Sequence, residues 1–164
     1  MTEEPHWLPA MMLVSGDWNE VVRRLYNVFA SDFISGRPRL GDLPVWWDRQ
    51  LLPGDRYEEG FWHLVSRTDP ESGDRLPDFR RAERLPWCAP TIAHVSDPSV
   101  TWWDYEEAQG RVRTYVWLRD FDYVVVLQKK HLRLGTVAFL ITAFHVDGHS
   151  SRRGLQRKYE QRWV

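Results

Sequence analysis

One histidine in the sequence is placed where it could transfer a proton. The stretch YEEGFWHLVSR, residues 57–67, is an apolar run that carries His63 near its middle and ends on Arg67. A histidine near its ordinary pKa accepts or donates a proton close to neutral pH, so His63 could be a general base or acid beside a cation. A histidine at the edge of the core, hydrogen-bonded to the backbone, gives the same pattern, and composition alone favours that structural role.

Arginines follow in FRRAERLPW, residues 79–87. Arg81 and Arg84 are three positions apart, which places them on one face of a helix, so both guanidinium groups could contact a single phosphate. Arg80 lies beside them. A solvated helix face explains the three arginines equally well.

The second half of the chain alternates between apolar and polar residues. VTWWDYEE, RVRTYVWLRDF, YVVVLQKKH and TVAFLITAFHV predict four successive strands joined by short turns. Thr142 lies in the last of them, and on a regular strand it points the same way as Leu140 and Phe144. Its hydroxyl is expected either to bond a backbone group or to position a substrate oxygen.

A basic and aromatic face is predicted on the strand at residues 111–119. Its apolar face suits a core, and its other face carries Arg111, Arg113, Tyr115, Trp117 and Arg119. Aromatic and basic side chains in alternation are typical of a surface that holds single-stranded nucleic acid. Lys158 and Tyr159, in the basic segment that ends the sequence, could contact a nucleic-acid backbone or simply cover the sheet.

Metal and disulfide chemistry is not expected. His145 and His149 are four residues apart, but Gly148 interrupts a helix there and no third ligand has suitable spacing. The single cysteine, Cys88, excludes an internal disulfide and suits a reducing compartment. We therefore expect no metal and no other cofactor.

The composition predicts one globular domain over residues 1–164. Hydrophobic residues make up 43% of the chain and charged residues 27%, with a net charge of −1. No apolar run reaches the length of about 18 residues that a membrane span needs. Acidic residues near the start argue against a secretory signal, so a cytoplasmic protein is expected.

The order of elements predicts an α+β fold. A helix is expected after Asp17, with an apolar stripe of Val21, Leu25, Val28 and Phe29. A short strand at residues 45–48, a helix of about two turns between Pro77 and Pro86, and a short helix or extended tail at the end complete the prediction. N-terminal helices would thus precede a four-stranded antiparallel sheet.

Four motifs in order carry a family resemblance: FWHLVSR, RRAERLPW, YVVVLQKK and FLITAFHVDGHSSRRGLQRKYE. They resemble the phage- and toxin-associated branch of the barnase–EndoU–colicin–RelE (BECR) superfamily of metal-independent ribonucleases. The resemblance implies a nuclease core over residues 57–164 with helices before a four-stranded antiparallel sheet, and it leaves residues 1–56 unplaced. This chain reads TAF where the family often has TAY, so Phe144 offers no hydroxyl.

The same resemblance implies roles for individual residues. His63 would be the general base or acid, Arg84 the phosphate-stabilising cation and Thr142 the hydroxyl of the last strand. Supporting contacts would come from Arg67, Arg81, Lys158 and Tyr159, and the basic face adds Arg113 and Trp117.

The expected function is a metal-independent RNA endonuclease. It would cleave tRNA or another RNA by attack of the 2′-hydroxyl to leave a 2′,3′-cyclic phosphate, as a toxin or phage-associated effector with a possible antitoxin or immunity protein as partner. Two alternatives stay open. One is a non-catalytic RNA-binding module, and the other is a protein-interaction domain that uses its ten tryptophans, above all in PVWWDRQ and VTWWDYEE, as interface anchors.

Overall fold

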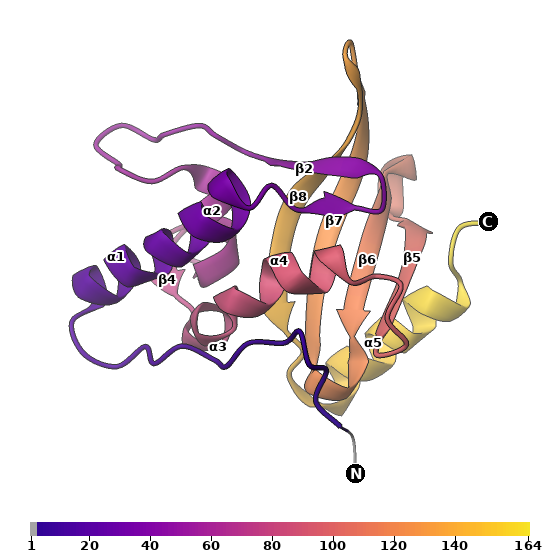
Figure 1. Cartoon of the computed structure of the whole chain (residues 1–164), viewed down its shortest axis with the longest axis horizontal. Helices are drawn as coiled ribbons and strands as arrows, with labels where there is room; N and C mark the ends of the chain where they lie inside the picture. The colour runs from indigo at the N-terminus through magenta and orange to yellow at the C-terminus, as the bar shows by residue number, and fades with distance from the viewer. Residues whose placement is uncertain (1–2) are drawn as a thin grey trace.

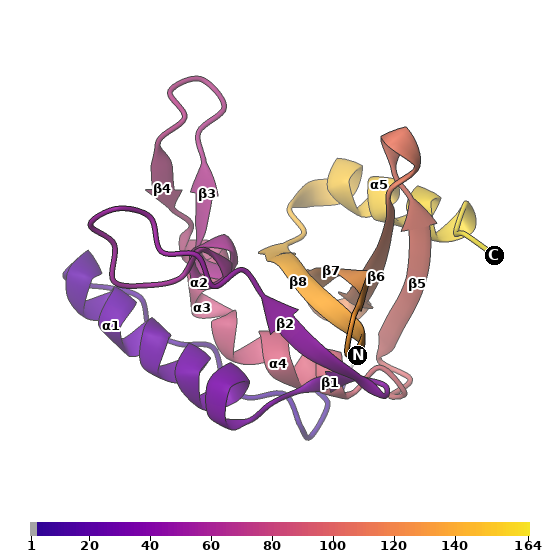
Figure 2. The same ribbon diagram turned by 90° about the horizontal axis from the view of Figure 1, so that it is seen from above.

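A curled, mixed sheet runs through the middle of the molecule (Figures 1 and 2). The computed structural model describes residues 3–164, and its six strands lie in the order β1-β2-β8-β7-β6-β5. Their bounds are β1 Arg39–Leu40, β2 Leu43–Trp47, β5 Val100–Glu106, β6 Val112–Leu118, β7 Tyr123–Leu132 and β8 Gly135–His145. β5 to β8 form an antiparallel meander, whereas β2 pairs with β8 in parallel.

The prediction of a four-stranded antiparallel sheet is therefore wrong, although the α+β class is correct. The four strands of the second half are present, but β2 and β1 extend the sheet beyond β8. β2 is five residues long and its partner lies more than ninety residues away along the chain. Periodicity in so short a segment cannot reveal a parallel partner.

Helices cover both faces of this sheet. They are α1 Trp18–Phe29, α2 Glu59–Val65, α3 Phe79–Glu83, α4 Leu85–Ala93 and α5 Gly148–Glu160, with a π-helical turn η1 Ala30–Ser35 and short 3₁₀ turns η2 Ala108–Gly110 and η3 Arg119–Phe121. A small hairpin of β3 Ser66–Thr68 and β4 Arg75–Pro77 projects from α2 (Figure 2). None of the helices within residues 3–164 has the length and apolarity to cross a membrane.

The first hydrophobic core lies between the sheet and helices α1, α2 and α4. The expected helix after Asp17 is present, and α1 buries Val21, Leu25 and Phe29. Phe29 packs its ring against Trp47 of β2. This core also includes residues of α2, α4 and β5 to β8, so residues on both sides of position 56 belong to one packed unit.

Proline begins α4 where it was expected to end a helix. α3 stops at Glu83 after little more than one turn, and α4 starts at Leu85 with Pro86 in its first turn. Proline is tolerated at that position because the first N–H groups of a helix have no partner within it. α4 then continues past Pro90 to Ala93.

The second core lies under α5, on the opposite face of the sheet (Figure 2). Trp103, Tyr115, Trp117 and Leu155 meet there, and Trp117 is completely buried. The aromatic members of the face predicted to hold nucleic acid are thus interior residues. Alternation along a strand shows that its two faces differ in polarity. It does not show that a helix later in the chain covers one of these faces.

A β-bulge divides β8. Thr142 pairs with Val126 and Leu140 pairs with Leu127, so Ile141 is an extra residue on β8. As a result Leu140 faces the first core, whereas Phe144 packs against the second. The expectation that Thr142 points the same way as Leu140 is wrong for this reason.

Two glycines offer a matched test of the packing. A Cβ at Gly60 would lie 2.8 Å from Trp47 Cβ and 3.0 Å from the Asp48 carbonyl oxygen, whereas a Cβ at Gly154 would meet nothing within 4 Å. We predict that Gly60→Ala lowers the free energy of unfolding by about 1–3 kcal/mol. Gly154→Ala, in the middle of α5, should raise it by about 0.5–1 kcal/mol. Urea unfolding measures both, and equal effects would contradict this packing.

Candidate active site

The edge of β8 beyond β2 is covered by helices. β2 pairs with β8 only as far as Trp47 and Leu140, and no strand of the described chain continues the sheet there. Helices α2 and α3 contact this part of β8 instead. Thr142 Oγ1 donates a hydrogen bond of 2.9 Å to the carbonyl oxygen of His63, which ties β8 to the last turn of α2.

Arg81 joins the same three elements. Its Nη1 donates to the carbonyl oxygens of His63 at 3.1 Å and Ser66 at 3.0 Å, and to Thr142 Oγ1 at 3.2 Å. Its Nε forms an ion pair of 3.2 Å with Asp78. Burial lowers the pKa of Arg81 from its ordinary value. Arg81 is thus a link between α3, α2 and β8 rather than a free surface cation.

A hollow of about 330 Å³ opens beside this junction. Its lining residues are His63, Ser66, Arg67, Thr68, Arg75, Arg81, Ile141 and Thr142. The side chains of His63 and Arg67 are exposed to solvent. Arg75 forms an ion pair with Glu59, so Arg67 is the lining guanidinium that has no ion pair within residues 3–164.

Arg84 does not reach this hollow. It is only 8% exposed, and its Nη1 donates to Glu83 Oε1 at 2.6 Å and to the Arg80 carbonyl oxygen at 3.1 Å. The prediction that Arg81 and Arg84 share a helix face fails because the backbone leaves the helical conformation at Arg84 (φ −100°, ψ 5°). The guanidinium groups of Arg81 and Arg84 consequently contact different parts of the protein.

A second hollow, of about 290 Å³, lies between α5 and the sheet and shares Thr142 with the first. Arg113 and Lys158 line it. Lys158 Nζ donates to Glu107 Oε1 at 3.0 Å and lies 2.8 Å from the hydroxyl of Tyr115. Burial alone would raise the pKa of Glu107, but hydrogen bonds from Tyr115 and Lys158 outweigh it and lower that pKa.

The remaining predicted contacts lie away from both hollows. Trp117 is buried in the second core. Tyr159 packs edge-on against Trp103, with ring centres 5.4 Å apart. The structure therefore brings His63, Arg67, Arg81 and Thr142 together, places Arg113 and Lys158 on the neighbouring hollow, and separates Arg84, Trp117 and Tyr159 from them.

Sequence reasoning missed Ser66, Thr68 and Arg75. They lie on the β3–β4 hairpin, which the sequence analysis did not assign as strands. The turn signal was present in the segment TDPESGDRL, where Asp69 and Gly73 close the hairpin. Three-residue strands carry too little periodicity to be recognised beside such a turn.

The pKa of His145 lies below the ordinary value of a histidine. Burial lowers its pKa, and the positive charges of Arg84 and Arg80 lower it further, against the opposing effect of Asp122 and Asp147. No group of three His, Cys, Asp or Glu side chains in the described part of the chain could hold a metal ion.

Comparisons with known proteins give no match among family models, curated proteins or solved structures. Function must therefore be inferred from the side chains that line these hollows and from the sequence motifs.

The junction at Arg81 gives a test of stability. We predict that Arg81→Met lowers the free energy of unfolding by about 1–3 kcal/mol, because the carbonyl oxygens of His63 and Ser66 and the Asp78 carboxylate lose their donor. Arg67→Met removes the same charge from the same hollow and should change it by less than about 0.5 kcal/mol. Urea unfolding of both variants measures the difference, and a comparable loss in the two would show that Arg81 is not a structural link.

The lowered pKa of His145 predicts a pH dependence. The group is easier to protonate in the unfolded chain, so its contribution to stability is present above the ordinary histidine pKa of about 6.5 and is lost as the pH falls through the lower pKa of the folded state. The free energy of unfolding should therefore drop more steeply between pH 7.5 and pH 5 in the natural protein than in His145→Gln. Parallel curves would contradict the shift.

Proposed function

We propose that this chain is a metal-independent RNA endonuclease that acts at the His63 hollow. The observation that carries the proposal is the shared lining of one hollow by an exposed imidazole, the guanidinium groups of Arg67, Arg75 and Arg81, and Thr142. A proton-transfer group beside cations is the chemistry that phosphodiester cleavage requires. The resemblance of the sequence motifs to the BECR ribonucleases supports the same reaction.

In the proposed reaction the His63 imidazole accepts the proton of the ribose 2′-hydroxyl. The 2′-oxygen then attacks phosphorus, the bond from phosphorus to the 5′-oxygen breaks, and the leaving oxygen takes up a proton from water. The hydroxide left behind removes the proton from His63, which returns the imidazole to its starting state. The products are a 2′,3′-cyclic phosphate and a 5′-hydroxyl end. A positioned proton transfer of this kind contributes about 10²–10⁴-fold to the rate.

Arg67 takes the role that the motifs suggested for Arg84. It is exposed on the hollow, and its charge is free to stabilise the phosphate oxygens in the transition state. Arg84 is buried and bound to Glu83, so a role in contact with substrate is not proposed for it. Arg75 is paired with Glu59, which neutralises its charge, so no contact with the phosphate is assigned to it.

Thr142 and Arg81 are positioning residues in this proposal. The Thr142 hydroxyl donates to the His63 carbonyl oxygen and accepts from Arg81, so both groups hold the last turn of α2 in place. Because Thr142 also borders the hollow under α5, an RNA strand could continue from Arg67 toward Arg113.

The motif resemblance extends the proposal to the setting of the reaction. It supports a toxin or phage-associated effector that cleaves tRNA or another RNA in the cytoplasm and is restrained by an antitoxin or immunity protein.

Cleavage of total tRNA by the purified chain in the presence of EDTA tests the proposal. We predict that His63→Ala lowers the cleavage rate by about 10²–10⁴-fold, because the proton acceptor is lost. His149→Ala is the matched control, since His149 is exposed on α5 and lines neither hollow. Thin-layer analysis of the product ends should show 2′,3′-cyclic phosphate.

Two results would contradict a catalytic role for His63. One is intact RNA after incubation with the natural protein, and the other is equal cleavage by His63→Ala. Salt-sensitive binding of RNA that remains intact, and that survives His63→Ala, would instead identify a binding module.

A further inference from the structure

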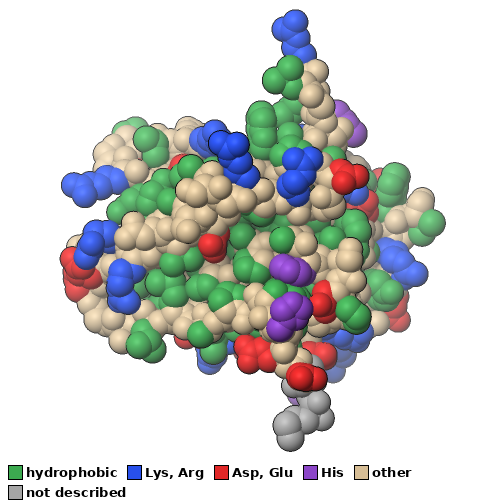
Figure 3. All heavy atoms as spheres, in the orientation of Figure 1, with side chains coloured by type: hydrophobic (Ala, Val, Ile, Leu, Met, Phe, Trp, Pro, Cys, Tyr) green, Lys and Arg blue, Asp and Glu red, His purple; other side chains and the backbone are tan. Residues whose placement is uncertain are grey.

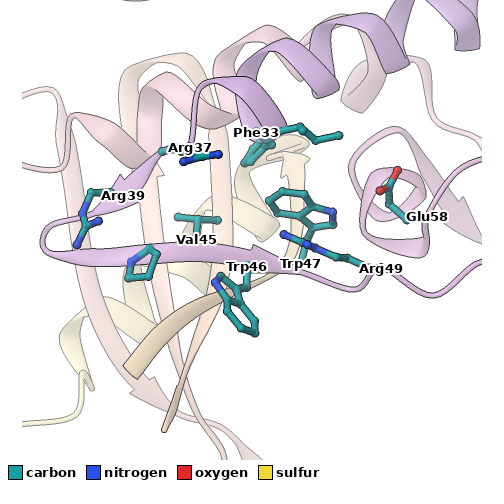
Figure 4. Close-up of a pocket in the computed structure, with 11 residues that line it drawn as sticks. Phe33, Arg37, Arg39, Val45, Trp46, Trp47, Arg49 and Glu58 are labelled. Carbon is teal, nitrogen blue, oxygen red and sulfur yellow. The ribbon is translucent and has the colours of Figure 1, made fainter. Parts of the chain in front are cut away.

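A third hollow, also lined by cations, lies near the start of α2, between η1 and β2 (Figure 4). Its volume is about 510 Å³. Arg37, Arg39 and Arg49 line it, together with the aromatic side chains of Phe33, Trp46 and Trp47. Figure 4 shows Arg37 between Arg39 and Phe33 on one side of this cleft and Arg49 beside the Trp47 ring on the other. We call it the arginine cleft.

The charge of the arginine cleft is not neutralised by its own lining. Glu58 is the acidic residue among its lining side chains. Burial and the neighbouring Glu58 carboxylate raise the pKa of Tyr26 to about 12. Arg37 and Arg49 form no ion pair within the described chain. Lys and Arg side chains gather over the β1–β2 side of the molecule (Figure 3).

The backbone around Arg37 is held in an unusual conformation. Arg37 has a φ of +47°, in the left-handed region that side chains other than glycine rarely occupy. It follows η1, a π-helical segment, and such segments are often found at functional sites. Local strain of this kind persists only where the surroundings impose it.

Trp46 lies at the rim of the cleft, with its ring on the other side of β2 from Val45 and Arg37 (Figure 4). It is 42% exposed, whereas Val45 and Trp47 on either side are buried. An indole face beside guanidinium groups matches a nucleotide, because the base can stack on the ring while the phosphate binds the cations. Arg49 already lies over the Trp47 ring, 4.6 Å from its centre, which holds its guanidinium at the cleft.

We propose that the arginine cleft is a second binding site for single-stranded RNA, with phosphates on Arg37 and Arg49 and a base on Trp46. This inference rests on the proposed function, because it gives the cleft the same substrate. Glu58 borders the cleft and caps the start of α2, and His63 lies about 8 Å further along the axis of that helix, on a different face of it. In this proposal one strand passes around α2 to occupy both sites, so the cleft favours long substrates over short ones.

Binding and cleavage by the double variant Arg37→Gln/Arg49→Gln test this proposal. Fluorescence anisotropy with a labelled RNA of about 15 nucleotides, in a His63→Ala background that prevents cleavage, gives the dissociation constant. We expect it to rise by about 10-fold at low salt, and the slope of log Kd against log salt to fall by about 1.4, or about 0.7 for each lost phosphate contact. Arg23→Gln/Arg24→Gln removes two charges from the exposed face of α1 and should leave both values unchanged.

Substrate length separates this proposal from the proposed function. With His63 present, the cleft variant should cleave a dinucleotide as fast as the natural protein and a 15-nucleotide RNA about 10-fold less efficiently. Unchanged binding by the cleft variant, or an equal loss on both substrates, would overturn the role of the cleft. If the natural protein cleaves neither RNA but the cleft variant still binds more weakly, the nuclease proposal fails and the binding site stands.

Discussion

The position of His63 depends on hydrogen bonds at the edge of β8 that β2 does not cover. β2 ends at Trp47, and the part of β8 beyond Leu140 would otherwise expose its edge. Thr142 and Arg81 bind the backbone oxygens of His63 and Ser66, so the helices that cover this edge are fastened to it. The same hydrogen bonds fix the orientation of the last turn of α2 and therefore the position of the His63 imidazole. Packing and candidate chemistry therefore share one set of contacts.

Strong local patterns in the sequence were sufficient to predict α1 and the strands β5 to β8. The apolar stripe of α1 and the alternation in β5 to β8 each extend over several residues and give a clear period. The motifs also suggested His63, Arg67, Arg81 and Thr142 as candidate site residues, and the fold brings these four residues to one hollow. These features depend on residues close together in the chain, or on motifs that can be read in order.

Features that depend on distant partners could not be derived in this way. The parallel pairing of β2 with β8, the burial of Trp117 under α5 and the break between Arg81 and Arg84 each arise from tertiary packing. The excess of arginine over lysine, nineteen to three, was weak evidence for phosphate binding. Two of these arginines make structural contacts instead, since Arg81 donates to three acceptors and the buried Arg84 forms an ion pair with Glu83.

The extra residue at Ile141 makes this strand sensitive to its length. Leu140 and Phe144 point to opposite cores only because β8 has one residue more than β7 at this bulge. Loss of a single codon there would restore strict alternation and rotate either Thr142 and Phe144 or the preceding half of the strand to the wrong side. A substitution leaves each side chain of β8 on its own face of the sheet, whereas deletion of one residue moves part of the strand to the other face. Deletions in this short segment should therefore destabilise the protein in a way that no single substitution does.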